Sequence, residues 1–142
     1  MDLRPLSPTV SVAPMLEPGD MAALAEAGVT AVICNRPDAE VPPTHQAQAM
    51  QEAAEAAGLS YTYNPVAMPS LTVDAVDEQA DAIAAAPGPV VAYCASGTRS
   101  AVLWALAQAG RMPTADIMRS LEAAGYPMPG LGPQIDALAA GR

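Results

Sequence analysis

Short apolar segments alternate with alanine-rich helical segments up to Cys94, and this alternation constrains the fold more than any other feature. Parallel strands need crossover connections, which helices usually supply, so the pattern predicts a mostly parallel sheet flanked by helices. The run 29–34 is short and continuously apolar, as expected for a strand buried on both faces. The predicted strands are residues 10–16, 29–34, 59–66 and 90–93.

The segments between these strands carry signals for helix boundaries. We expect Asp20 to cap a helix that ends at Gly28, and Thr44 to cap a second helix that ends at Gly58. Residues 72–86 are predicted to form an acidic amphipathic helix, because apolar side chains recur at helical spacing along one face.

No strand pattern follows Cys94. Residues 101–109 are strongly helical, residues 113–125 have Thr114 as an expected N-cap, and residues 133–140 form a last short helix. The predicted fold class is therefore α/β, with a mostly parallel central sheet and only helices after the cysteine. A length of 142 residues matches one domain, so we expect residues 1–142 to form a single domain.

The charged residues exclude several partners and chemistries. With 15 acidic and 6 basic residues the formal net charge is −9, which argues against nucleic acid or an anionic membrane as a partner. The chain has no lysine, so it cannot perform Schiff-base chemistry or build a Walker-type phosphate loop.

Metal and disulfide chemistry are also limited by composition. The chain has two cysteines and one histidine, so these residue types cannot supply the four ligands of a structural zinc site. Two cysteines are also too few for a disulfide framework. We therefore expect no metal and no cofactor. Residues 1–8 lack the apolar core of a signal peptide, and no apolar run reaches the length of a membrane span. These features predict a reducing, bacterial-type cytoplasm as the location.

The strongest functional signal is the segment 93–106, YCASGTRSAVLWAL, in which a strand ends at Cys94 and a helix follows. The strand delivers Cys94 to the carboxyl edge of the sheet, where α/β proteins place their ligands. The loop can turn its N–H groups inward as an anion-binding nest, beside the positive end of the helix. The residues expected to bind the anion are Ala95, Ser96, Gly97, Thr98 and Arg99.

The same groups favour the thiolate form of Cys94, and the hydroxyl of Ser100 can add a hydrogen bond to the sulfur. Cys94 is then the nucleophile, the loop amides hold the incoming anion, and Arg99 balances charge in the transition state. The alternative is an inert buried cysteine. The combination of Cys94, Gly97 and Arg99 between a strand and a helix favours the catalytic interpretation.

A second candidate motif follows the strand that ends at Cys34. Asn35, Arg36 and Asp38 are expected at the same sheet edge as Cys94. Arg36 is a candidate second anion contact, and Asp38 is a candidate general acid or a partner for an arginine; the alternative for both is a structural turn. Cys34 is expected to be a core residue, with a resolving disulfide to Cys94 as the lesser alternative.

Two segments of the chain, ICNRPD at 33–38 and YCASGTR at 93–99 continuing to Leu103 and Trp104, resemble a known family. This family comprises bacterial phosphatase-like domains that are also found fused to beta-lactamase-like hydrolases. The resemblance covers nearly the whole chain. It implies a dual-specificity-phosphatase-like fold, with Cys94 as the nucleophile and Arg99 as the anion-binding arginine.

Three features depart from ordinary cysteine phosphatases. Those enzymes place five residues between the cysteine and the arginine, whereas four intervene here, the spacing of rhodanese sulfurtransferases. Their general-acid aspartate has no counterpart in residues 61–73, and Asp74 is expected inside a helix. Tyr93 also replaces the histidine that typically precedes the phosphatase cysteine.

These departures favour sulfur transfer through a Cys94 persulfide, with thiosulfate or a low-molecular-weight persulfide as the small anionic substrate. The alternative is hydrolysis of phosphate monoesters through a phosphocysteine, which the fold resemblance supports. A second alternative is a non-catalytic module that senses oxyanions or persulfides. The sequence leaves the oligomeric state open.

Overall fold

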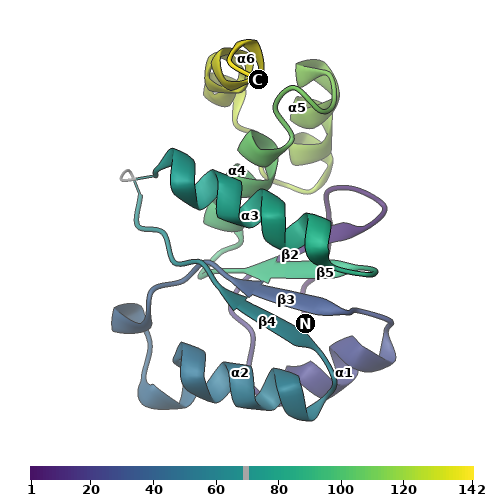
Figure 1. Ribbon diagram of the computed structural model, residues 1–142, viewed down its shortest axis with the longest axis vertical. Coiled ribbons are helices and arrows are strands. Elements are labelled where there is room, and N and C mark those ends of the chain that lie inside the picture. Colours follow the sequence, from purple (N-terminus) through teal and green to yellow (C-terminus); the bar gives the residue numbers. More distant parts are fainter. Residues whose placement is uncertain (69–70) are drawn as a thin grey trace.

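The computed structural model describes residues 1–68 and 71–142, and its centre is a five-stranded sheet (Figure 1). The strand order is β1-β2-β5-β3-β4; β1 runs antiparallel to β2, and the other neighbours are parallel. The predicted α/β class is confirmed. The strands are β1 (Arg4–Pro5), β2 (Val10–Ala13), β3 (Ala31–Cys34), β4 (Ser60–Tyr63) and β5 (Val90–Tyr93).

Helices cover both faces of this sheet, as Figure 1 shows. Helices α1 and α2 lie on one face, α3 and α4 lie on the other, and α5 and α6 pack against α4. Within the described ranges no strand follows β5, as predicted. The helices are α1 (Asp20–Glu26), α2 (Ala47–Ala56), α3 (Val73–Ala85), α4 (Thr98–Ala107), α5 (Thr114–Ala123) and α6 (Gly132–Ala140), with short 3-10 turns η1 (Asp38–Glu40), η2 (Pro43–His45) and η3 (Pro129–Leu131).

Three strands, β2, β3 and β4, are shorter than the apolar runs that predict them. Strand β2 stops before Pro14, which has no N–H to continue the ladder, and β4 stops before Pro65. No sequence pattern predicts β1, because a two-residue edge strand that contains a proline has no alternation to detect.

Three predicted N-caps are wrong. Asp20 is itself the first residue of α1, and its carboxylate accepts a hydrogen bond from the N–H of Glu17 before the helix. Thr44 lies in η2, short of the start of α2. Thr114 donates to the Asp136 carboxylate at 2.6 Å instead of capping α5. Each polar side chain finds a partner outside the helix that it was expected to cap.

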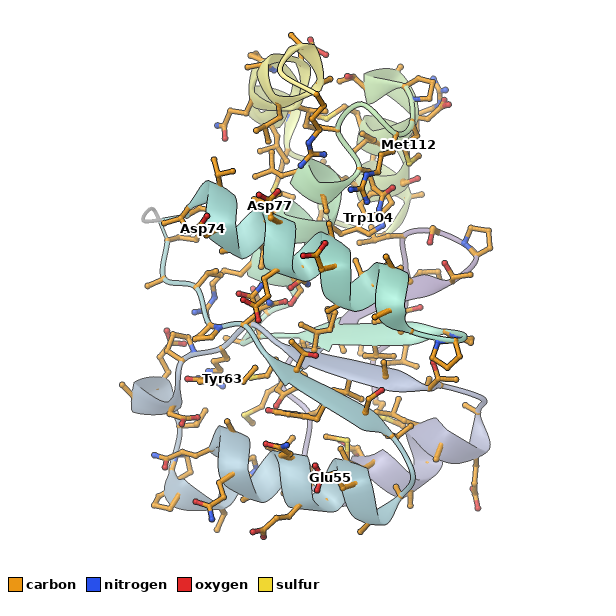
Figure 2. All side chains as sticks on the ribbon, viewed as in Figure 1. Glu55, Tyr63, Asp74, Asp77, Trp104 and Met112 are labelled. Carbon is orange, nitrogen blue, oxygen red and sulfur yellow. The ribbon has the colours of Figure 1, made fainter. Side chains whose placement is uncertain are left out.

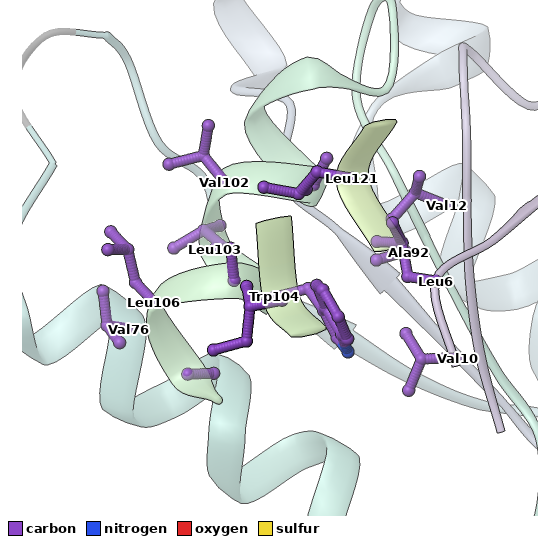
Figure 3. Close-up of a cluster of buried hydrophobic side chains, with 14 of the residues drawn as sticks. Leu6, Val10, Val12, Val76, Ala92, Val102, Leu103, Trp104, Leu106 and Leu121 are labelled. Carbon is purple, nitrogen blue, oxygen red and sulfur yellow. The ribbon is translucent and has the colours of Figure 1, made fainter. Parts of the chain in front are cut away.

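Two apolar clusters hold the layers together. The larger cluster lies between the sheet and α3 to α6 and is centred on α4, whose residues 100–107 are all buried. Figure 3 shows Trp104 of α4 in this cluster with Leu6 and Val10. The smaller cluster lies between the sheet and the helices α1 and α2. Residues 101–107 have no polar face, as expected for a helix that is covered on all sides.

The register of the parallel strands brings several chain segments to one edge of the sheet. Beyond the strands, the N–H of Asn35 donates to the Tyr93 carbonyl and the N–H of Asn64 to the Cys34 carbonyl, both at 2.8 Å. The residues that follow the strands, Cys94 among them, therefore meet at the carboxyl edge. The last residues of the four parallel strands, which pair in one row, are Ala13, Tyr93, Cys34 and Tyr63.

The acidic side chains of α3 lie on its exposed face, where Figure 2 shows Asp74 and Asp77. Among residues 1–68 and 71–142, no group of three or more His, Cys, Asp or Glu side chains is placed to hold a metal ion. No helix in these two ranges has both the length and the apolar character needed to cross a bilayer.

Candidate active site

The cysteine loop, residues 94–99, connects β5 to the first turn of α4. Gly97 has a φ of +90°, in the left-handed region that favours glycine, and it immediately precedes the helix. This bend directs the Gly97 N–H to the Sγ of Cys94, at 3.1 Å. Helix α4 begins earlier than predicted, so Arg99 lies in its first turn. The exposed residues of the loop are Ala95, Ser96 and Thr98.

Two opposing effects determine the pKa of Cys94. Burial of the sulfur raises the pKa, whereas hydrogen bonds from the backbone N–H groups of Ser100, Gly97 and Arg99 lower it. The hydrogen bonds outweigh burial, so the pKa of the Cys94 thiol lies below its ordinary value. Peptide nitrogens therefore face the sulfur as predicted, and they favour the nucleophilic thiolate.

The sulfur is completely covered in this arrangement, because Cys94 is 0% exposed. The side chain of Arg99 beside it is 14% exposed. The sulfur is therefore enclosed by the loop and its neighbours in this structure.

Arg99 is held by Glu40, a carboxylate that is not among the predicted site residues. The two terminal nitrogens of Arg99 donate to the two oxygens of Glu40, at 2.9 and 2.8 Å. One of these nitrogens also donates to the Val66 carbonyl at 2.9 Å. This bidentate pairing fixes the orientation of the guanidinium. The available signal was a second acid in the same motif, two positions after Asp38.

Arg36, a predicted anion contact, shares the same carboxylate. Its Nε donates to Glu40 at 3.2 Å, and a terminal nitrogen lies 3.2 Å from the sulfur of Met15. The structure thus places Arg36 beside Arg99 through a common partner. Hydrogen bonding from Arg99 holds the pKa of Glu40 below its usual range, and Arg36 adds to this shift. Glu40 is therefore ionised at neutral pH and is a poor proton donor.

Asp38 has a structural contact in place of the predicted arginine. Its carboxylate accepts from the N–H of Ala47, the first residue of α2, at 2.7 Å. Its own N–H donates to the hydroxyl of Tyr63, at 2.8 Å, and Figure 2 shows Tyr63 projecting from this end of β4. The prediction that Asp38 holds an arginine is wrong, because η1 directs this carboxylate to α2 and leaves Glu40 facing the arginines. A general-acid role for Asp38 stays a prediction.

A buried polar network connects the cysteine loop to α3. Asn35, Gln79 and Ser100 are each 0% exposed, and Asn64 is 5% exposed. The amides of Asn35 and Gln79 bind each other reciprocally, at 2.9 and 3.1 Å. Asn64 donates to the same oxygen of Gln79 at 3.0 Å, and the Ser100 hydroxyl donates to Asn35 at 2.8 Å. The network links the ends of β3 and β4 to α3 and α4 with its buried amides paired.

The predicted hydrogen bond from the Ser100 hydroxyl to the sulfur is corrected by this network. The hydroxyl hydrogen goes to Asn35, because a serine hydroxyl has one hydrogen to donate and the amide oxygen lies at 2.8 Å. The backbone N–H of Ser100 nevertheless lowers the pKa of Cys94. Ser100 therefore joins the buried network to the sulfur.

We expect Gln79→Leu to lower the free energy of unfolding by roughly 2–4 kcal/mol, because the buried amides of Asn35 and Asn64 each lose a hydrogen bond that no water can replace. Urea unfolding followed by circular dichroism measures this loss. The matched control is Gln48→Leu at an exposed position of α2. Equal losses from the two substitutions would contradict the importance of the network.

Cys34 and Cys94 face opposite sides of the sheet. Cys34 pairs with Tyr93 in the sheet register, and both belong to the cluster beneath α1 and α2. The Tyr93 hydroxyl hydrogen bonds to that of Tyr61 at 2.9 Å on the same side. Side chains alternate along a strand, so Cys94 points to the other side, toward Ser100. Both cysteines are free, and this arrangement confirms Cys34 as a core residue and opposes a disulfide.

The lowered pKa of Cys94 predicts a specific pH dependence of stability. Between the folded-state pKa and the unfolded thiol value of about 8.5, the unfolded chain binds more protons, so stability rises with pH. The free energy of unfolding of the wild type, relative to Cys94→Ala, should therefore increase through this range and level off above it. The contribution is lost as pH falls through the folded-state pKa. Urea unfolding at several pH values measures the difference, and a flat or falling difference would contradict it.

The fold and the loop together define a class of protein. The central strand of a mostly parallel α/β sheet delivers a low-pKa cysteine to an amide-lined loop, and an arginine follows on the next helix. This is the arrangement of a phosphatase-like protein with a cysteine nucleophile. Comparisons with known proteins identify the family within this class.

Residues 2–111 match the family model of the beta-lactamase hydrolase-like protein, phosphatase-like domain, and the chain belongs to this family. A beta-lactamase hydrolase-like protein of Agrobacterium fabrum is 35% identical over 111 residues, which are 77% of this chain and 25% of that protein. A protein of the same name from Xylella fastidiosa is 40% identical over 90 residues, 62% of this chain and 21% of that protein. The matches thus span about a quarter or less of these relatives' length.

Solved structures show the same fold. A candidate phosphatase from Neisseria meningitidis has a TM-score of 0.80 and 30% identity, covering 97% of this chain and 99% of its own. A second candidate phosphatase, from Shewanella putrefaciens, has a TM-score of 0.73 at 20% identity, covering 99% of this chain and 87% of its own. TpbA of P. aeruginosa, solved in complex with phosphotyrosine, has a TM-score of 0.69 at 16% identity, covering 99% and 89%.

These comparisons confirm the family resemblance and the dual-specificity-phosphatase-like fold. They support a cysteine-based, phosphatase-like enzyme, and they favour the phosphate alternative over the sulfur transfer that loop length suggested. The family match ends at residue 111, so α5 and α6 lie beyond it.

Proposed function

We propose that the chain hydrolyses phosphate monoesters through a covalent phosphocysteine at Cys94. The thiolate attacks phosphorus while the bond to the leaving oxygen breaks, and the departing alkoxide or phenoxide takes a proton from solvent. Water then cleaves the sulfur–phosphorus bond, which releases inorganic phosphate and restores the thiolate. The N–H groups around the sulfur and the guanidinium of Arg99 stabilise charge on the phosphoryl oxygens during transfer.

The observation that carries this proposal is the inward N–H of Gly97 on a cysteine of lowered pKa, in a chain of a phosphatase-like family. Donors that stabilise a thiolate also suit the oxygens of a phosphoryl group, because both are anions seated in a ring of peptide dipoles. The phosphotyrosine complex of TpbA supports a small phosphate-bearing substrate for this fold.

The acids near the loop determine the best test substrate. Glu40 is ionised and paired with Arg99 and Arg36, and the Asp38 carboxylate binds the N–H of Ala47. A substrate whose leaving group departs without protonation therefore tests the loop itself, independently of a general acid. p-Nitrophenyl phosphate is such a substrate, because nitrophenolate is a stable anion.

Sulfur transfer is a second candidate, favoured by the four residues that separate Cys94 from Arg99. In this reaction the thiolate attacks the outer sulfur of thiosulfate, the sulfur–sulfur bond breaks and sulfite leaves. The product is a Cys94 persulfide, from which an acceptor thiolate takes the outer sulfur.

Parallel incubations with p-nitrophenyl phosphate and with thiosulfate separate the two candidates. The proposal expects steady release of nitrophenolate by the wild type and no gain of a sulfur atom in its intact mass. Sulfur loading without nitrophenolate release would replace the proposal by sulfur transfer. Failure of both reactions would contradict enzymatic turnover and favour the oxyanion-sensing module.

A further inference from the structure

We propose that Tyr126 is a positioning residue of the cysteine loop, whose hydroxyl orients the peptide between Ser96 and Gly97 toward the sulfur. The Tyr126 hydroxyl donates to the Ser96 carbonyl at 3.0 Å. The N–H at the other end of the same peptide, that of Gly97, donates to the Sγ of Cys94 at 3.1 Å. The proposal deepens the proposed function, because it concerns how the nucleophile of that reaction is held.

The geometry of the peptide unit makes these two hydrogen bonds dependent on each other. A trans peptide is planar, and its C=O and N–H point in opposite directions. The Tyr126 hydroxyl holds the oxygen on the outside of the loop, so the N–H must face the inside. If this peptide flipped, both hydrogen bonds would be lost and the Ser96 oxygen would face a thiolate.

The preceding peptide is held in the same way by a backbone group. The N–H of Met15, in the segment that follows β2, donates to the Ala95 carbonyl at 3.2 Å. Because the C=O and N–H of a trans peptide point in opposite directions, the N–H of Ser96 points away from Met15. Two successive peptides of the loop therefore have their oxygens bound from outside, one by Met15 and the next by Tyr126.

Tyr126 packs so closely against the cysteine loop that residue 97 must be a glycine. A Cβ built on Gly97 would lie 2.1 Å from the Tyr126 hydroxyl oxygen, so no larger residue fits beside this side chain. Tyr126 is 7% exposed. The phenol therefore rests directly against the backbone of Gly97, where a hydroxyl can fix the peptide without displacement by water.

Tyr126 is itself held by the N-terminal segment. The guanidinium of Arg4 in β1 lies over its ring, 5.2 Å from the centroid, and donates to the Ala124 carbonyl at 3.4 Å. Tyr126 follows α5, beyond residue 111 where the family match ends. A segment outside the matched region thus completes the anion-binding loop.

The experiment compares Tyr126→Phe with the matched control Tyr61→Phe, both in a Cys34→Ser background where Cys94 is the single thiol. Each substitution removes one phenol hydroxyl and keeps its ring, and the Tyr61 hydroxyl binds Tyr93 on the opposite face of the sheet. The ultraviolet absorbance of the thiolate, followed against pH, gives the ionisation constant of Cys94 without any need for turnover. Thermal unfolding of the same variants shows that they are folded.

Tyr126→Phe is expected to weaken the ionisation of Cys94 by roughly 3–10-fold, the effect of one lost hydrogen bond, and to move the acid limb of kcat/KM for p-nitrophenyl phosphate to higher pH. Tyr61→Phe is expected to change neither. An unchanged titration in folded Tyr126→Phe, or an equal shift in both variants, would overturn the proposal. Because the titration needs no substrate, a protein that fails to hydrolyse phosphate could still show the Tyr126 effect, so the two failures are distinguishable.

Discussion

Replacement of Cys94 by serine should lower kcat for p-nitrophenyl phosphate by roughly 10⁴-fold or more, the scale expected when an enzyme loses its nucleophile. The loop is built around an anion of low basicity: its N–H groups hold the pKa of the thiol below its ordinary value. A serine hydroxyl stays protonated at neutral pH in the same setting, so the attacking anion is absent. Initial rates with saturating substrate measure the effect.

The other free cysteine provides the matched control. Cys34→Ser replaces a buried thiol on the opposite face of the sheet, where it donates to the Arg36 carbonyl at 3.3 Å, a hydrogen bond that a serine hydroxyl can replace. Its turnover should stay close to that of the wild type. If folded Cys94→Ser retained more than about a tenth of the activity, the nucleophile would have to lie elsewhere.

Arg99→Lys should lower kcat/KM by roughly 10²–10³-fold, comparable to the loss of one donor to a developing oxyanion. Lysine keeps the positive charge and can still pair with Glu40, but its ammonium lacks the planar fork that binds both oxygens of that carboxylate. The position of the charge relative to the phosphoryl oxygens is then no longer fixed. The substitution therefore tests geometry, since the net charge is unchanged.

Arg119→Lys is the control for this substitution. Arg119 is an exposed arginine of α5 that pairs with Asp116, and exposed pairs of this kind contribute little. Its kcat/KM should equal that of the wild type. If the Arg99→Lys and wild-type proteins have the same melting temperature and also the same kcat/KM, Arg99 is not part of the catalytic machinery.

Local sequence patterns predicted the parts of the fold that depend on near neighbours. Strand β5 and helix α3 lie within a residue of their predicted bounds, and Thr72 caps α3 through the N–H of Ala75 at 3.1 Å. The caps of α1 and α2 could not be predicted. The carboxylate at α2 comes from Asp38, which approaches only once η1 has turned the chain.

The same difference, between local sequence patterns and tertiary contacts, explains which residues of the site could be predicted. Cys94 and Arg99 lie in one contiguous segment, so their spacing and their position before a helix were visible in the sequence. Glu40 and Tyr126 lie far from the cysteine loop in the sequence, and only the tertiary fold brings them into contact with it. Gln79 left a partial signal, since it is a polar residue three positions after the buried Val76 on the same helix face.

Helix α3 shows how packing overrides an apolar pattern. Val73 shares the helical spacing of the buried Val76 and Ala80 but is 60% exposed, whereas Gln79 is completely buried. The helix packs its face toward the ends of β3 and β4, where the amides of Asn35 and Asn64 need partners. Hydrophobic periodicity depends only on the spacing of apolar residues, so it cannot reveal a buried polar network.

The most direct test of the central claim is the intact mass of the protein after rapid acid quench during turnover of p-nitrophenyl phosphate. We predict a gain of one phosphoryl group, mapped by peptide fragmentation to Cys94 and absent from Cys94→Ser. Nitrophenolate release by the wild type without any covalent adduct on Cys94, or an adduct on another residue, would contradict it.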